Sequence, residues 1–239
     1  MYFDIRCIAE PIQTDSDKKE TMTVLLLGAS GLIGSHCLKI LLSDDRFDRV
    51  IALVRRPLDI THPKLTQTIV DFDKLDNYAA EIKADAVLST LGTTLRKAGS
   101  SVKFTKVDYE YQLKVAEIAR RNGATTFILL SSIGADKKSV VLYTKVKGEV
   151  EEAISKLGYE KVIILRPSIL LGERTESRPG EAVGQWVAKQ MPFLFSGPLS
   201  KYKGVSADTV ATAMINAVQK PYKGVGIVEN LDIFEWAKN

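Results

Sequence analysis

Two side chains in the second half of the chain have the types and the spacing needed to move a proton. Tyr143 and Lys147 stand four residues apart in a segment with helical periodicity, so both project from one face of a helix. A free tyrosine ionises at about pH 10, and a neighbouring ammonium favours the phenolate. The pair therefore predicts a proton donor or acceptor that works closer to neutral pH. Ser131 and Ser132 end a strand upstream and add hydroxyl groups to the same neighbourhood.

A glycine-rich turn follows the first hydrophobic strand of the chain. Gly28 permits a tight turn, Gly31 leaves room for a pyrophosphate to approach the backbone, and Gly34 allows close packing of helix on strand. A helix that begins at such a turn directs its first N–H groups at a phosphate. The segment therefore predicts a dinucleotide site rather than a chance glycine-rich turn. The other residues of this turn assigned to the cofactor are Ser30, Leu32 and Ile33.

Two arginines end the second predicted strand. Many NAD-binding proteins carry an acid there, about twenty residues after the last glycine, which accepts hydrogen bonds from the ribose 2′-hydroxyl. This chain has Arg55 and Arg56 instead, and guanidinium groups form charge-assisted hydrogen bonds with a 2′-phosphate. NADPH is therefore predicted over NADH; the alternative is that both arginines are ordinary solvated residues.

Two further strand ends supply candidate contacts. Asp71 and Phe72 follow the third strand, where they would flank the adenine, with Asp71 accepting a hydrogen bond from its amino group. Leu91, Gly92 and Thr93 follow the fourth strand, at the position expected beside the nicotinamide ribose. The alternative for this second group is a simple loop between strand and helix.

A parallel sheet is needed to bring these residues together. Short apolar strands alternate with amphipathic helices, which predicts an α/β, doubly wound parallel sheet, a Rossmann fold, with ligands outside the carboxyl ends of the strands. The expected strands are Thr23–Leu27, Arg49–Val54, Thr66–Val70, Ala86–Thr90, Thr126–Leu130 and Lys161–Leu165. The expected helices are Leu32–Ser43, Leu75–Ile82, Val102–Arg121, Tyr143–Leu157 and Thr209–Val218.

The 239 residues predict one sizeable domain. Residues 1–22 are expected to form an N-terminal extension and residues 23–239 a single NAD(P)-binding domain. Within that domain, residues from about 167 to 239 are expected to form a small region that caps the substrate pocket, because the pattern of strands and helices loosens there and prolines interrupt it.

The amino-acid composition limits the kinds of partner and the cellular locations that the chain is expected to have. The net charge of +4 is mild and both signs are spread along the chain, which gives nucleic-acid binding little support. No apolar run approaches the roughly eighteen residues of a membrane span, and the N-terminus does not read as a signal peptide. Cys7, Cys37, His36 and His62 do not form a metal-ligand pattern, and the cysteine usage fits a reducing, cytoplasmic compartment. No metal is expected.

The order of these motifs resembles the short-chain dehydrogenase/reductase superfamily in its extended and atypical branches. The matching features are the glycine turn, Ser131-Ser132, Tyr143-x-x-x-Lys147 and Leu165-Arg166-Pro167, and the resemblance adds Arg166 and Pro167 to the expected cofactor contacts. More narrowly, the chain is similar to the Tat-interactive-protein-like oxidoreductases, which are small NADPH-binding proteins. The segments that carry this similarity are 91–94, 97–99, 130–136, 146–151 and 176–181.

The resemblance implies a hydride transfer. Tyr143 would supply or remove the proton at a carbonyl, Ser132 would orient that carbonyl, and Lys147 would hold the nicotinamide ribose and influence the tyrosine. One residue departs from the pattern: Asp108 stands where superfamily members often carry an asparagine that serves a proton relay. The departure leaves such a relay without support here.

Three functions follow from these observations. The favoured one is an NADPH-dependent oxidoreductase acting on an unidentified carbonyl or alcohol. The second is an NADPH-sensing regulatory protein without turnover, acting through a protein partner; a homodimer is also compatible with the sequence. The third is a sugar-nucleotide epimerase, which the small C-terminal region disfavours. The intact serine, tyrosine and lysine set favours the enzyme, because a sensor needs no proton donor beside the nicotinamide.

Overall fold

A seven-stranded parallel sheet forms the centre of the protein. The computed structural model describes residues 22–171 and 203–238; residues 1–21 of the predicted N-terminal extension and the 176–181 motif lie outside them. The strands follow the order β3-β2-β1-β4-β5-β6-β9, which confirms the doubly wound sheet. Their bounds are β1 Thr23–Leu27, β2 Arg49–Val54, β3 Leu65–Ile69, β4 Ala86–Ser89, β5 Thr126–Leu130, β6 Lys161–Arg166 and β9 Gly224–Glu229. A separate pair joins β7 Leu170–Leu171 to β8 Val205–Ser206.

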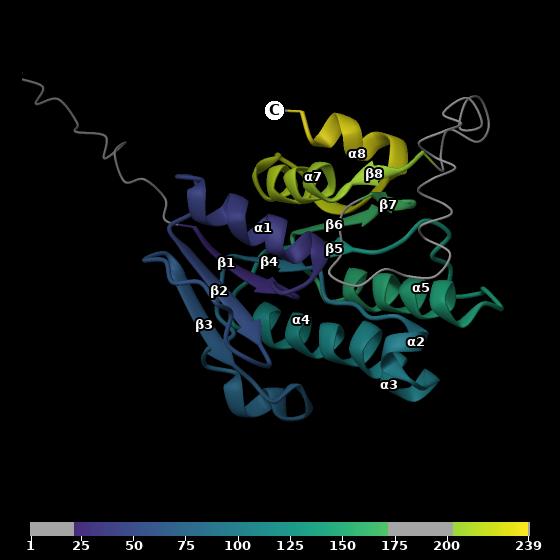
Figure 1. Cartoon of the computed structure of the whole chain (residues 1–239), viewed down its shortest axis with the longest axis horizontal. Helices are drawn as coiled ribbons and strands as arrows, with labels where there is room; N and C mark the ends of the chain where they lie inside the picture. The colour runs from purple at the N-terminus through teal and green to yellow at the C-terminus, as the bar shows by residue number, and fades with distance from the viewer. Residues whose placement is uncertain (1–21, 172–202, 239) are drawn as a thin grey trace, which may run out of the picture.

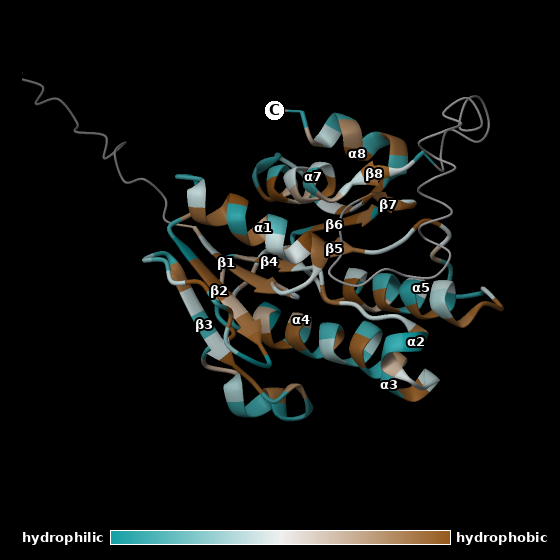
Figure 2. Cartoon of the chain, in the orientation of Figure 1, coloured by the Kyte–Doolittle hydropathy of each residue, from teal (hydrophilic) through white to brown (hydrophobic). Residues whose placement is uncertain are grey.

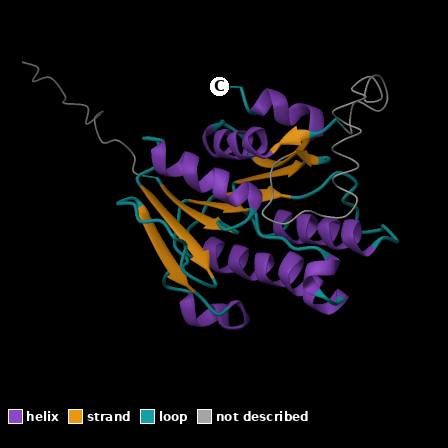
Figure 3. Ribbon diagram, in the orientation of Figure 1, coloured by secondary structure: helices purple, strands orange, loops and turns teal. Residues whose placement is uncertain are grey.

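Helices cover both faces of the sheet (Figures 1 and 3). On one face lie α1 Leu32–Ser43, α7 Ala207–Gln219 and α8 Asn230–Trp236. On the other lie α2 Leu95–Ala98, α3 Ser101–Thr105, the π-helical turn η2 Lys106–Glu110, α4 Tyr111–Arg121 and α5 Leu142–Ser155. The 3₁₀ helix η1 Phe72–Tyr78 follows β3 and packs against α4. The sheet is therefore the middle of three layers.

Alternating side chains of each strand supply the two halves of the core. In β1, Val24 and Leu26 belong to the cluster under α1 and α7, whereas Leu25 and Leu27 belong to the cluster under α4 and α5. All four side chains have no exposed surface. Strands buried on both faces have no polar alternation, which explains the continuous apolar runs in the sequence and the brown strands in Figure 2.

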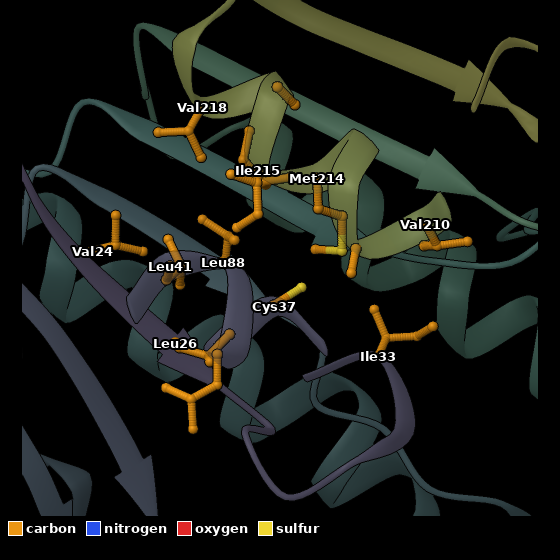
Figure 4. Close-up of a cluster of buried hydrophobic side chains, with 14 of the residues drawn as sticks. Val24, Leu26, Ile33, Cys37, Leu41, Leu88, Val210, Met214, Ile215 and Val218 are labelled. Carbon is orange, nitrogen blue, oxygen red and sulfur yellow. The ribbon is translucent and has the colours of Figure 1, made fainter. Parts of the chain in front are cut away.

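The packing of α1 on α7 completes one face of the core (Figure 4). Cys37 and Leu41 of α1 meet Met214 and Ile215 of α7 in a cluster that excludes water. Burial raises the pKa of the Cys37 thiol to about 12, so this cysteine is a small apolar core residue that stays protonated. The described part of the predicted capping region therefore completes the sheet domain, through α7, β9 and α8.

Several expected elements differ from the structure. The predicted helix at Leu75–Ile82 is wrong: the Asp71 side chain caps a 3₁₀ turn that is interrupted at Lys74, whose φ of −133° is not helical. The predicted helix at Val102–Arg121 is three consecutive pieces, α3, η2 and α4. The edge strand β9 was not expected, because it contains two glycines and is buried only at alternate positions.

Candidate functional site

Two adjoining cavities follow the carboxyl ends of the central strands. The first, here the Tyr143 cavity, has a volume of about 490 Å³ and lies between the glycine turn, α5 and the segment after β6. The second, here the Arg55 cavity, has a volume of about 1060 Å³ and lies beside the ends of β2 and β3. Five residues line both: Ser30, Leu91, Gly92, Thr93 and Lys97. The cavities therefore form one long cleft, at the place where open α/β sheets bind ligands.

The glycine turn shapes the edge of this cleft. Gly28 has a φ of +80°, a conformation that side chains rarely adopt, and a Cβ there would lie 2.8 Å from the backbone of Thr90 and Leu91. A Cβ on Gly34 would lie 2.0 Å from the Gly28 carbonyl oxygen. These two glycines therefore let β1, α1 and the β4 loop approach one another, and both stand behind the cavity wall.

Gly31 differs from the other two glycines because it lines the Tyr143 cavity. Within the described ranges, its hypothetical Cβ would meet only the Gly28 carbonyl oxygen, at 3.2 Å. Gly31 is also the N-cap of α1 and has no side chain that could accept hydrogen bonds from the first N–H groups of the helix. Those groups are consequently available to a phosphate at the cavity edge.

Helix α5 brings Tyr143 and Lys147 to the same cavity. They lie one turn apart, and both line it. The ring of Phe104 from α3 packs against Tyr143, with ring centroids 5.8 Å apart. Gly148 allows the loop after β5 to rest on α5, because a Cβ there would lie 2.2 Å from the backbone nitrogen of Lys137. The position of the tyrosine is thus set by the Phe104 ring and by the packing of the loop after β5 on its helix.

A buried ion pair joins α5 to η2. Lys147 Nζ lies 2.9 Å from Asp108 Oδ1, and the two side chains are 5% and 0% exposed. Burial is the largest single influence on the pKa of Lys147 and lowers it, but the Asp108 carboxylate, together with Tyr143 and Glu151, outweighs burial, and the net effect raises the pKa. Lys147 is therefore a charged ammonium inside the protein at neutral pH.

The π-helical turn η2 places Asp108 in the cleft, and turns of this type are frequent at functional sites. Its second oxygen, Oδ2, accepts a hydrogen bond of 2.8 Å from the Thr93 N–H, which connects the turn to the loop after β4. The first oxygen, Oδ1, is the one buried side-chain N or O atom in residues 22–171 and 203–238 without a well-directed hydrogen bond. It faces Lys147 and lies 3.2 Å from where a Cβ on Gly92 would be.

The two serines after β5 have different surroundings. Ser131 lines the Tyr143 cavity and is buried, and its hydroxyl donates a hydrogen bond to Glu151. Ser132 is half-buried and does not line that cavity; its hydroxyl donates to the carbonyl of Ile133 at 3.3 Å. Glu151 also binds the guanidinium of Arg166, with Nη2 to Oε2 at 2.5 Å. Arg166 therefore has a structural ion pair behind the cavity.

The Arg55 cavity is strongly cationic. Arg55 and Arg56 are exposed, and in the described parts of the chain neither has a carboxylate within ion-pair distance. The cavity has five cationic and two acidic side chains: Arg55, Arg56, Lys97, Lys103, Lys106, Asp71 and Asp73. An excess of positive charge at the ends of β2 and β3 suits a phosphate-bearing ligand.

An aromatic corner closes the same cavity. The rings of Phe72 and Tyr111 lie 5.3 Å apart. The Tyr111 hydroxyl donates to Asp73 at 2.5 Å, and Lys106 Nζ lies 2.7 Å from the same oxygen. This network lowers the pKa of Asp73, through its hydrogen bonds to Lys106 and Tyr111. A flat apolar wall beside fixed polar groups fits a purine ring.

Most of the predicted site residues line the cleft. Those in the Tyr143 cavity are Ser30, Gly31, Leu32, Ile33, Leu91, Gly92, Thr93, Tyr143, Lys147 and Pro167. Those in the Arg55 cavity are Arg55, Arg56, Asp71 and Phe72, together with the shared residues. Four predicted residues line neither cavity: Gly28, Gly34, Ser132 and Arg166.

Sequence reasoning missed Asp108 as a partner of Lys147, and it also missed Ser168, Ile169 and Leu170 after β6. The departure from asparagine at Asp108 was a usable signal, because a carboxylate in an apolar environment needs a cation. Nothing in the residue types after β6 indicates a cavity wall.

The residues present fit a nicotinamide dinucleotide. Gly31 leaves the backbone open at the N-terminus of α1, and the cationic cavity continues from the shared residues toward Arg55. At the opposite end, Lys147, Thr93 and Tyr143 line the cavity with polar groups that suit ribose hydroxyls. Along the cleft, the aromatic corner, the N-terminus of α1 and the Lys147 end therefore suit a purine, a pyrophosphate and a ribose in the order in which a dinucleotide carries them.

Comparisons with known proteins agree with this geometry. The model of the NAD(P)H-binding family matches residues 28–221. The chain is 41% identical to protein HTATIP2 of Rattus norvegicus over 229 residues, which are 93% of this chain and 92% of the relative. It is 36% identical to the mitochondrial protein fmp52 of Emericella nidulans, covering 84% and 89% of the two chains. The corresponding Candida albicans protein is 35% identical, with coverage of 85% and 90%.

Solved structures share the fold at low sequence identity. MoeE5 in complex with UDP-glucuronic acid and NAD superposes with a TM-score of 0.67 at 19% identity, covering 87% of this chain and 76% of that one. The Bordetella bronchiseptica enzyme WbmH in complex with NAD⁺ has a TM-score of 0.62 at 20% identity, with coverage of 87% and 75%. These likenesses confirm the Rossmann-type sheet.

The relatives also correct one expectation. The predicted cytoplasmic location is contradicted by the fungal relatives, which are named as mitochondrial proteins. Cysteine usage reports only on redox conditions, and reducing conditions do not identify one compartment. Among the described helices, none has the length and apolarity to cross a bilayer. On the family model and the shared sequence, the chain belongs to the NAD(P)H-binding family, in the atypical branch of the short-chain dehydrogenase/reductase superfamily.

Proposed function

We propose that the protein is an NADPH-dependent oxidoreductase that interconverts a carbonyl and an alcohol. The observation that carries the proposal is the position of Tyr143 and Lys147 in one cavity, which opens at its other end onto the glycine turn. The cofactor, when bound, supplies or recovers the hydride. The volume of about 490 Å³ is within the range of small-molecule sites.

Each residue has a distinct role in this proposal. Tyr143 holds the proton that its phenolic oxygen gives to, or takes from, the substrate oxygen. Lys147 binds the ribose and places a positive charge near the phenol. The family resemblance assigns the orientation of the substrate carbonyl to Ser132, although Ser131 is the serine that lines the cavity. The variants Ser131→Ala and Ser132→Ala distinguish the roles of the two serines. Ser132→Ala should lose turnover and keep its fold. Ser131→Ala should lose stability, because the Ser131 hydroxyl donates a hydrogen bond to the buried Glu151.

The preference for NADPH rests on Arg55 and Arg56. Both guanidinium groups line the cleft without a carboxylate partner in the described structure, so they are available to a 2′-phosphate. A ribose with only a 2′-hydroxyl would leave their charge without a matching group. NADH is therefore expected to bind more weakly.

The test has two stages. Mass spectrometry of the ligand retained by the purified protein should find NADP(H), and calorimetry should give a lower Kd for NADPH than for NADH. A panel of aldehydes and ketones should then show NADPH oxidation that Tyr143→Phe abolishes. NADPH binding without turnover on any compound, together with partner binding that depends on NADPH, would instead support a regulatory protein.

A further inference from the structure

The Asp108–Lys147 ion pair is buried and joins η2, α5 and the loop after β4. The carboxylate has no exposed surface and contacts two elements besides its own turn: the Thr93 N–H donates to Oδ2 at 2.8 Å, and Lys147 Nζ lies 2.9 Å from Oδ1. A neutral asparagine could accept the Thr93 hydrogen bond equally well. The negative charge of Asp108 therefore serves the ion pair with Lys147, because the hydrogen bond to Thr93 does not need it.

We propose that Asp108 is a positioning residue: as the buried counterion of Lys147, it holds the ammonium in the cleft, charged and beside the β4 loop. This inference rests on the proposed function for its biological meaning, since the ribose and Tyr143 are the groups that the ammonium serves. The structural relation between the two side chains exists without a ligand.

Charge and burial at Lys147 support this role. An ammonium 5% exposed is strongly disfavoured unless an anion accompanies it. The acidic or ionisable groups that act on it are Asp108 from η2 and, within α5, Tyr143 and Glu151. Glu151 is already paired with Arg166 of β6, and Lys97 from α2 adds a like charge to the cavity. Asp108 is thus the group best placed to keep the lysine protonated.

A titration of Lys147 in the ligand-free protein tests the inference. Lysines carrying ¹³C at the ε carbon are followed by NMR, and the Lys147 signal is identified by its absence in Lys147→Arg. The wild-type signal should stay that of an ammonium past the ordinary value of 10.5, because the pKa is raised. In Asp108→Asn, Lys147 stays buried but loses the neighbouring carboxylate, so the midpoint of its titration should fall by about one pH unit or more.

Glu152→Gln is the matched control. It removes one carboxylate from the same helix, at a side chain that pairs with Lys137 and Lys156 on the surface. The Lys147 midpoint should be unchanged there. An unchanged midpoint in Asp108→Asn as well would overturn the inference. Because no cofactor or substrate is present, the result is independent of whether the protein turns over.

Cofactor affinity provides a second measurement. Over the pH range in which the lysine of Asp108→Asn titrates and that of the wild type does not, the Kd for NADPH of the variant should rise several-fold more than that of the wild type, because only its lysine loses charge there. Equal pH dependence would contradict the inference. If Asp108→Asn does not fold, Asp108→Asn/Lys147→Met is compared with it. Recovery of folding by removing both charges supports the pairing, whereas failure of both variants would overturn it, because Asp108 would then be needed for something other than Lys147.

Discussion

The two ends of the cleft differ in the exposure and the pairing of their charged side chains. The Arg55 cavity is lined by exposed cations that outnumber the acids, and its two arginines have no ion-pair partner among the described residues. The Tyr143 cavity contains one buried cation matched by one buried anion. The positive charge of the Arg55 cavity is thus available to a ligand, whereas the buried lysine of the Tyr143 cavity is neutralised by a carboxylate of the protein.

The difference has energetic consequences. Exposed charges interact weakly, are screened by salt and can be removed with little effect on the fold. A buried pair is different, because removing one partner leaves an uncompensated charge in a low-dielectric environment. Substitutions at the Arg55 end should therefore change binding alone, whereas substitutions at the Tyr143 end should change chemistry or stability.

The largest effect is expected for Tyr143→Phe. This change keeps the ring against Phe104 and removes only the hydroxyl that carries the proton. Turnover should fall by about 10²- to 10⁴-fold, the usual contribution of a positioned acid or base, with NADPH affinity nearly intact. Steady-state kinetics and calorimetry measure the two quantities. An equal loss of affinity would show that Tyr143 binds the cofactor rather than serving the chemistry.

Lys147→Met should lower the stability of the protein as well as its activity. It leaves Asp108 buried without its cation, which costs about 3 to 5 kcal/mol in comparable pairs. Because the folded protein raises the pKa of Lys147, the stabilisation by the pair is fully present below the ordinary value of 10.5 and is lost only above it. Urea unfolding at pH 7 should show the loss, and Asp108→Asn/Lys147→Met should recover part of it. No loss at pH 7 would mean that the pair is solvated.

Arg55→Ala should affect binding alone. Loss of a charged hydrogen bond to a 2′-phosphate costs about 1.5 to 3 kcal/mol, or roughly tenfold to a hundredfold in Kd. Calorimetry should find NADPH weakened and NADH little altered, with an unchanged unfolding midpoint. Arg46→Ala is a suitable control, since Arg46 is paired with Asp44 and does not line the cleft. Equal weakening of both cofactors would refute the assignment of the 2′-phosphate site.

The smallest effect is the response to salt. The screening length shortens from about 10 Å at 0.1 M to about 3 Å at 1 M ionic strength. NADPH affinity should therefore fall modestly over this range and NADH affinity should fall less, because the exposed arginines meet the additional phosphate. Fluorescence titration of both cofactors at several salt concentrations measures the slopes. Identical slopes would argue that the 2′-position lies away from these cations.

Much of the fold could be predicted because the central strands are buried on both faces. Such strands appear in the sequence as short apolar runs, and β1, β2 and β5 begin and end as predicted. The hydrophobic pattern is weaker in β9, at the edge of the sheet, and in the short helix η1. β9 is buried at alternate positions only, and η1 depends on the Asp71 cap and the irregular backbone of Lys74, neither of which affects hydrophobic periodicity.

The candidate site was predicted where local motifs define it and missed where tertiary contacts do. The glycine turn and the Tyr143–Lys147 spacing are properties of single segments, so the sequence reveals them. The ion pair of Asp108 and Lys147 joins residues 39 positions apart in the sequence. Asp108 also lies in a π-helical turn, and the regular α-helical periodicity used for prediction does not anticipate such a turn. Ser131 and Ser132 are adjacent and chemically identical, so only their surroundings distinguish them.

The transfer of label from the cofactor to a product tests the central claim most directly. NADPH carrying deuterium at the transferable C4 position is incubated with the protein and a panel of carbonyl compounds, and the alcohols formed are analysed by mass spectrometry. We predict deuterium in at least one alcohol with the wild type and none above background with Tyr143→Phe. Tight NADPH binding without deuterium in any product would contradict the assignment of an oxidoreductase.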